Sequence, residues 1–257
     1  MRSLNTNSFV PQIHIKARFI AMPKGASYDL KLGGVQTSNK GISSRIINDE
    51  SFRNILQGLQ SHDDVETLAE PEVVTTSGRQ TQMRATLTMS VVTKFVLQES
   101  NNVPSIVPQT EPVETGPTLD VIPRVLPDGY TIELQVIPTM TEFLGYAPST
   151  KTTSAYTANG QEIDVPTVSP QFQVQETTNT VNLLDNQTVV LALNGQQVPA
   201  NLTAAAATFL QSDGSKTKYQ DRKTLVFITA TIVDQAGNRV HSDDDSYTNT
   251  SPSTGGQ

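Results

Sequence analysis

The side chains that most often carry chemistry are few and scattered in this chain of 257 residues. None of the three histidines, His14, His62 and His241, has the helical or short-loop spacing that would bring two of them together as metal ligands. His62 precedes Asp63 and Asp64, a grouping that acid–base catalysis can use, but the same cluster is more simply a solvated helix exit. We therefore expect no metal site and no catalytic residue.

Other common reaction and binding motifs are also missing from the sequence. The chain has no cysteine, which excludes a disulfide framework, a thiol nucleophile and thiolate metal ligands. It has no nucleophile elbow, Walker loop or dinucleotide fingerprint, so no cofactor is expected. The acidic run at 243–245 is the kind of exposed triplet that is normally only solvated. The formal net charge of −7 argues against nucleic acid as a partner, because binding phosphates requires a surplus of Lys and Arg.

The composition indicates a β-rich chain. Aromatic residues make up only 5 % and tryptophan is absent, whereas Thr, Val, Asn, Gln, Ser and Pro are plentiful. The length suits one large β domain or two small ones, and we expect a single extended domain followed by a tail. No apolar segment is long enough for a signal peptide or a membrane helix of about 20 residues.

The first part of the chain predicts strands around one short helix. Alternating apolar residues at 12–22 predict a half-buried strand, and 23–47 predict a loop or short hairpin. Asn48 or Asp49 can cap a helix whose apolar residues fall at helical spacing: Phe52, Ile55, Leu56 and Leu59. Short strands are expected at 65–68 and 72–76, on either side of Pro71.

The middle of the chain has the longest alternation. Residues 83–97 predict one strand of roughly 45–50 Å at about 3.3 Å per residue, either bent or broken by a bulge. A hairpin is expected from 118–125 and 130–141, joined by the turn Pro127–Asp128–Gly129.

The last third mixes weaker and stronger signals. Residues 145–170 lack periodicity and are rich in Thr, Ser and Pro, which predicts a mobile loop. A second hairpin is expected from 171–183 and 187–193 around the turn Asp185–Asn186. A weak helical signal at 198–211 precedes a strand at 223–234 that is apolar on both faces. Residues 242–257 are expected to be a disordered tail.

Taken in order, four segments resemble the successive blocks of the bacterial secretin family. They are residues 65–86, 116–143, 180–195 and 222–234. The resemblance extends from Pro11 to His241, and the secretin-type domain is expected over 1–241. The middle block is the most specific, with Gly116, Leu119, Pro123 and Gly129 matching the family's G-x-x-L-x-V-x-P hairpin pattern. The family-pattern structural positions are Pro71, Gly116, Leu119, Pro123, Gly129, Leu134, Thr188, Val190 and Phe227.

The resemblance implies a mainly β secretin-type domain with one or two short helices. Such a domain contributes strands to a large double-walled β-barrel of roughly 12–15 copies, the outer-membrane channel of type II or III secretion, type IV pili or phage export. Residues 95–116 are then the gate candidate. Further partners implied are outer-membrane lipid, a pilotin lipoprotein and inner-membrane secretion components, with the export signal and upstream domains outside this chain.

The sequence departs from the family pattern in two places. Ala192 replaces the first of the paired glycines in a late strand. Residues 198–215, which correspond to the membrane-contacting lip, lack the family's Pro-Gly-Leu-Phe and carry Leu202, Ala206 and Phe209 as candidate membrane-facing residues.

Two alternatives to a channel remain open at this point. One is a secretin-like periplasmic scaffold ring without a pore, which the altered lip would permit. The other is a monomeric β-sandwich that binds carbohydrate or protein, although the long alternation at 83–97 fits a sandwich poorly. An enzyme is the least favoured class, because the sequence offers no plausible pair of buried carboxylates.

Overall fold

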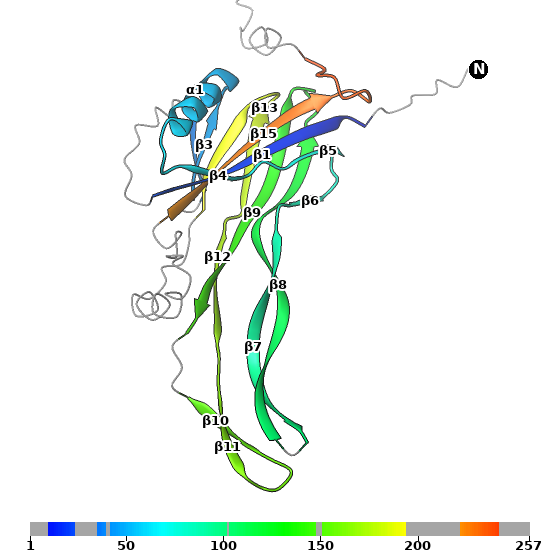
Figure 1. Cartoon of the computed structure of the whole chain (residues 1–257). Coiled ribbons are helices and arrows are strands. Elements are labelled where there is room, and N and C mark those ends of the chain that lie inside the picture. Colours follow the sequence, from blue (N-terminus) through cyan, green and yellow to red (C-terminus); the bar gives the residue numbers. More distant parts are fainter. Residues whose placement is uncertain are drawn as a thin grey trace, which may run out of the picture.

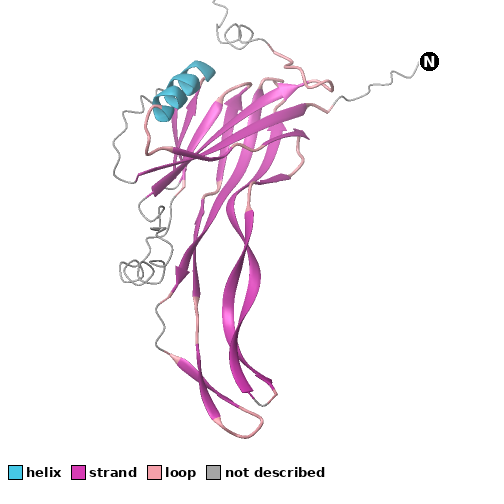
Figure 2. Cartoon of the chain, in the orientation of Figure 1, coloured by secondary structure: helices cyan, strands magenta, loops and turns pink. Residues whose placement is uncertain are grey.

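Strands make up nearly all of the regular structure. The computed structural model describes residues 10–23, 35–39, 42–101, 103–147, 151–193 and 222–241. Within this part of the chain, one helix lies beside the strands (Figures 1 and 2). In chain order the elements are β1 (Gln12–Pro23), β2 (Val35–Asn39), β3 (Ile42–Ile47), α1 (Asp49–Gln60), β4 (Glu66–Ala69), β5 (Glu72–Thr76), β6 (Thr81–Arg84), β7 (Leu87–Ser100), β8 (Val103–Val125), β9 (Thr131–Tyr146), β10 (Thr152–Tyr156), β11 (Glu162–Pro166), β12 (Pro170–Glu176), β13 (Asn179–Leu184), β14 (Thr188–Ala192) and β15 (Arg222–Val233).

The strands form two main sheets and a separate hairpin. The first sheet has the order β2-β3-β14-β15-β1-β4, with β5 also paired to β1. The second sheet has the order β12-β9-β8-β6, with β13 also on β9 and β7 also on β8. The pairings between strands in both sheets are antiparallel, and β10 pairs with β11 alone.

The main core lies between the two sheets. On β1 the alternating residues Ile13, Ile15 and Phe19 are each 0 % exposed, as their spacing predicted. They pack in one cluster with the inward residues of the second sheet, which include Leu119, Val121, Ile132, Leu134, Val136, Val181 and Leu183. The two sheets therefore form a sandwich that buries one face of each.

A second apolar cluster lies on the outer face of the first sheet, under α1. The helix begins where the Asn48 side chain accepts a hydrogen bond from the Ser51 amide at 2.9 Å, the cap predicted from the sequence. Its apolar stripe packs on the sheet, and Phe52 lies 5.6 Å from Phe227 between ring centroids. Neighbouring residues of β15 thus enter opposite cores, which confirms a strand covered on both faces.

The predicted hairpin of 171–183 with 187–193 is wrong. β13 pairs with β9 in the second sheet, whereas β14 lies between β3 and β15 in the first. All five residues of β14 are buried, so this strand must be covered on both faces and cannot form an isolated hairpin. The turn at Asp185 and Asn186 therefore carries the chain from one sheet to the other.

One further expectation changes in the structure and another is confirmed. Residues 145–170, predicted to be a loop, include the β10–β11 hairpin with Thr152 paired to Pro166. The long alternation at 83–97 is interrupted between β6 and β7, and the register of β7 against β8 shifts between Val92 and Lys94, as expected for a strand broken by a bulge. The predictions for 198–215 and 242–257 lie outside the described residues.

Candidate assembly and gating surface

Two projections extend beyond the sandwich. We call β7 with residues 103–115 of β8 the ribbon, and residues 142–146 of β9 with β10, β11 and β12 the arm. Figure 1 shows both leaving the sandwich on the same side and running away from it. Neither part contributes a residue to the main core cluster.

The ribbon leaves the sandwich at Gly116. Its φ is +119°, and a Cβ there would lie 2.8 Å from the Ala85 carbonyl oxygen and 3.2 Å from Thr86 Cα. Those two residues are the gap between β6 and β7, directly across the ladder from Gly116. Only glycine fits this backbone, so the family-pattern position marks the joint between sandwich and ribbon.

Below this joint the ribbon and the arm touch at a few points. The Val92 amide donates to the Tyr146 hydroxyl at 2.8 Å, and the Ala158 amide donates to Glu99 Oε1 at 2.8 Å. Between them lies an open cleft of about 440 Å³ whose lining includes Phe95, Leu97 and Tyr156. The two projections are thus joined by sparse contacts and not by a continuous ladder.

Strand β12 of the arm presents its side chains in the reverse of the usual order. Phe172 and Val174 are 36 % and 50 % exposed, whereas Gln175 and Thr177, the residue that follows the strand, have the opposite parity and are 3 % and 6 % exposed. Gln175 Oε1 and Thr177 Oγ1 have no hydrogen-bond partner within the described part of the chain. Apolar residues outside and polar residues inside are expected where the outer surface is covered by lipid or by another copy.

A half-buried carboxylate, with its Oε2 atom buried, lies next to these polar side chains. Glu142 of β9 pairs with Gln173 across the β9–β12 ladder. Burial raises the pKa of the Glu142 carboxyl, and the positive charge of Arg222 opposes this shift. Arg222 itself forms an ion pair with Glu66 at 2.8 Å.

The second sheet also ends in unpaired edges. Among the described strands, β12 has only β9 as a hydrogen-bonded neighbour, and below Gly116 β8 has only β7. Such edges are ready to accept a strand from another chain unless they are blocked. The edge of β12 and the edge of β8 below Gly116 are therefore without a neighbouring strand in the described chain.

The family-pattern positions fall into three structural groups. Buried core residues are Leu119, Leu134 and Phe227, with Val190 only 5 % exposed. Three residues hydrogen-bond to other segments. The carbonyl of Pro71 accepts from the Ala17 amide, and that of Pro123 accepts from the Gly78 amide. The hydroxyl of Thr188 lies 2.7 Å from that of Thr229. Gly116 and Gly129 hold positive φ values. The lip candidates Leu202, Ala206 and Phe209 lie outside the described residues.

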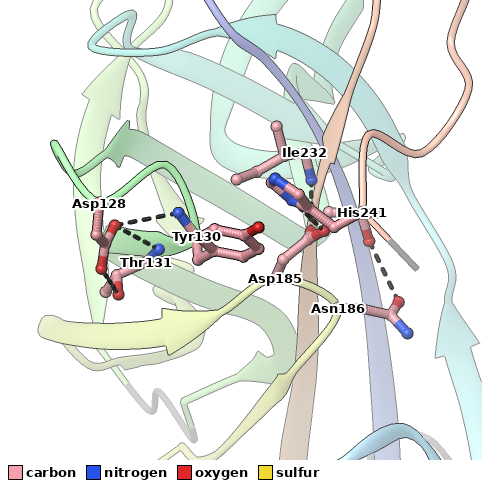
Figure 3. Close-up of polar contacts among 8 residues, drawn as sticks. Asp128, Tyr130, Thr131, Asp185, Asn186, Ile232 and His241 are labelled. Atoms are coloured by element: carbon pink, nitrogen blue, oxygen red, sulfur yellow. Dashed lines mark hydrogen bonds and ion pairs between the residues drawn. The ribbon is translucent and has the colours of Figure 1, made fainter. Parts of the chain in front are cut away.

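The turn between β8 and β9 is set by Asp128. Its carboxylate accepts hydrogen bonds from the amides of Tyr130 and Thr131 at 3.1 and 2.9 Å, and from the Thr131 hydroxyl (Figure 3). These bonds, led by that from the Thr131 hydroxyl, lower the pKa of Asp128. The Pro-Asp-Gly turn predicted from the sequence is confirmed.

The three histidines do not converge. His14 lies 3.3 Å from Glu72 on the outer face of the first sheet. His241 stacks on Tyr130 with 4.1 Å between ring centroids, and its Nδ1 lies 3.2 Å from Asp185 Oδ2 (Figure 3). Asp185 also accepts the Ile232 amide at 2.7 Å, so this cluster fastens the end of the described chain to the crossover between the sheets.

Sequence reasoning missed three residues of the ribbon. Pro104, Pro108 and Pro112 recur at every fourth position of β8, all on one parity of the strand. Their spacing in an alternating strand was the signal that could have found them.

Within the described ranges, no helix is long and apolar enough to cross a membrane. No group of three or more potential metal ligands is found in the same ranges.

Comparison with solved structures finds matches among bacterial secretins. The type IV competence pilus secretin PilQ of Vibrio cholerae matches with a TM-score of 0.37 and 14 % identity, covering 88 % of this chain and 62 % of that one. The type II secretin GspD of enteropathogenic Escherichia coli matches with 0.36 and 13 %, covering 89 % and 71 %. The InvG secretin domain β-barrel of the Salmonella SPI-1 injectisome matches with 0.34 and 12 %, covering 92 % and 64 %. A search of curated proteins found no match.

The open second sheet, the glycine joint and the projecting strands define a β-rich secretin-type domain. Residues 58–202, more than half of the chain, match the sequence model of the secretin family, described as bacterial type II and III secretion system protein. The chain therefore belongs to the secretin family.

Proposed function

We propose that this chain is one subunit of a homo-oligomeric outer-membrane channel for protein secretion or for pilus or phage export. A ring of roughly 12–15 copies would join the open edges of neighbouring second sheets, a head-to-tail arrangement that closes when the rotation allows it. The proposal is non-catalytic. It places the chain in the bacterial cell envelope, with outer-membrane lipid, a pilotin lipoprotein and inner-membrane secretion components as further partners.

The observation that carries the proposal is the reversed exposure of β12. In a soluble monomer, Phe172 and Val174 would face water while Gln175 and Thr177 are buried, an arrangement that costs free energy on both faces. In a barrel wall the same arrangement places apolar side chains against lipid or protein and polar ones against a polar interior.

The ribbon is the proposed gate. It contains the sequence-predicted gate segment 95–116 almost entirely and is connected to the sandwich through Gly116. Its contacts with the arm are few, which suits an element that must move to open a pore.

Conductance across a planar lipid bilayer tests both parts of this proposal. The full chain, extracted in mild detergent and reconstituted, should form particles that are mostly closed. A variant in which Val91 is joined to Glu111 by Asn-Gly lacks most of the ribbon, keeps a paired ladder position, and should conduct continuously.

A matched control shortens the other hairpin instead. Replacing 157–161 by Asn-Gly joins Tyr156 to Glu162 and keeps the ribbon at full length, but it removes the hydrogen bond from the Ala158 amide to Glu99. The particles should stay mostly closed, as with the full chain, because the ribbon itself is the proposed gate. Rings that do not conduct with either variant would contradict a channel and support the scaffold alternative.

A further inference from the structure

One edge of the ribbon carries a proline at every fourth residue. In β8, Pro104 pairs with Glu99, Pro108 with Phe95 and Pro112 with Ser90 across the β7–β8 ladder. A proline has no amide hydrogen, so it fits an antiparallel ladder without loss of a hydrogen bond only at a pair that exchanges none. The nitrogen of each proline therefore lies on the edge of β8 that faces away from β7.

The upper half of β8 confirms this parity. The carbonyl of Pro117 accepts from the Ala85 amide and that of Pro123 from the Gly78 amide. The backbone polar groups of odd-numbered residues of β8 therefore point toward β6. The register of β8 against β6 continues into β7 without a shift down to Val92. The backbone polar groups of even-numbered residues of β8 thus point to the opposite edge, the one that pairs with β9 in residues 116–125.

The β8–β9 ladder stops at the pair of Gly116 with Thr141. Continued without a shift, its register would set Pro112 opposite Gly145, at a pair that requires an amide hydrogen from Pro112. Pro108 and Pro104 would fail in the same way further along the strand. Each of these pairs would lack a hydrogen bond, so the prolines oppose extension of the ladder along the ribbon beyond Pro112, although β8 and β9 both continue past the last pair.

The ribbon instead turns its other edge toward the arm. The Val92 amide, which points away from β8, meets the Tyr146 hydroxyl at the end of β9. Strand β8 thus borders β9 above the joint, while β7 borders the arm below it (Figure 1). The proline-bearing edge is left without a neighbouring strand within the described chain.

We infer that Pro104, Pro108 and Pro112 are a barrier to strand addition that keeps the ribbon a separate two-stranded unit hinged at Gly116. The barrier acts against β9 of the same chain and against a strand of a second copy. The inference rests on the proposed function and deepens it, because a gate that became part of the barrel wall could not open. It also assigns the joining of copies to other edges, such as that of β12.

Amide hydrogen exchange tests the inference directly in the full chain. The amides of Ile106, Thr110 and Glu114 point to the proposed barrier edge, whereas those of Val107, Gln109 and Glu111 pair with β7. The first set should exchange at least about tenfold faster than the second, read at residue level by mass spectrometry. Equal protection of both sets would mean that the edge is paired and would overturn the inference.

Substitution of the prolines provides a second test. P104T/P108T/P112T restores the missing donors, so the first set of amides should become protected or the particles should associate edge to edge. The control S105T/Q109T/E111T adds the same residue type at amides that already face β7, and it should behave like the unmodified chain.

A triple variant that exchanges and remains dispersed like the control would also overturn the inference. If the triple variant does not fold, P112T alone carries the test, because Pro112 is the first barrier that the ladder meets. The difference in exchange rate between the two sets of amides is a property of one ribbon, so it can be measured whether or not the particles conduct. A failure of the channel proposal is therefore distinguishable from a failure of this one.

Discussion

Replacement of Gly116 by alanine should destabilise the chain far more than the same change at another glycine of positive φ. At Gly116 two costs add together, since φ is +119° and the new Cβ would meet the Ala85 carbonyl oxygen at 2.8 Å. At Gly129 φ is +76° and nothing lies within 4 Å of the position that a new methyl group would take, so only the conformational cost applies. The pair of variants separates the two effects.

The expected magnitudes follow from these geometries. A left-handed conformation costs an L-residue about 1–2 kcal/mol, which is the expectation for Gly129→Ala. At Gly116 a conformation that is nearly restricted to glycine costs about 1–3 kcal/mol. Relief of the clash by shifting backbone adds a further cost of about 1–3 kcal/mol. Gly116→Ala should therefore lower the free energy of unfolding by about 2–6 kcal/mol.

Urea unfolding followed by circular dichroism measures both variants against the unmodified chain. Hydrogen exchange should also show added opening at Ala85 and Thr86, the residues that must move. Equal losses of stability for the two variants would refute the reasoning, because they would show that the close approach at Gly116 is not a constraint on the joint.

Three further predictions concern the sandwich. Leu134→Asp and Phe227→Asp should each abolish folding or assembly, because each buries an unpaired charge. The control Leu87→Asp, at a position that is 77 % exposed, should be tolerated. Soluble expression and particle size distinguish the two outcomes. Glu142→Gln should stabilise the chain at pH 7, because a raised pKa in the folded state means that ionisation of the Glu142 carboxyl opposes folding. This advantage should vanish below about pH 4.5, where the carboxyl is protonated in both states. Urea midpoints measured from about pH 4 to 8 would reveal a wrong sign. Asp185→Ala should cost about 1–3 kcal/mol in the same assay, because it leaves a buried amide without its acceptor, and an unchanged midpoint would contradict this.

Local patterns predicted individual elements well. The alternation of β1 and the Asn48 cap of α1 were read correctly because each depends on neighbours within a few residues. The crossover at Asp185 was missed because alternation identifies a strand but does not identify its partner. The complete burial of β14 was the deciding fact, and it depends on residues of β3 and β15 that are distant in sequence.

The candidate site was predicted less completely than the fold. Gly116 was found through the family pattern, but its role as a joint depends on the approach of Ala85, which only the folded ladder creates. The reversed faces of β12 could not be read from the sequence, because alternation defines two faces without saying which one meets the core. Phe172 would by hydrophobicity alone be assigned to the interior, yet it is exposed.

The central claim is that this chain assembles into a ring. The most direct measurement is the particle mass of the full chain, expressed in a bacterial host with an added export signal and extracted in mild detergent, by light scattering with direct imaging. We predict rings of more than about ten copies, held together by strand edges. A well-folded monomer at the same protein concentration would contradict the account.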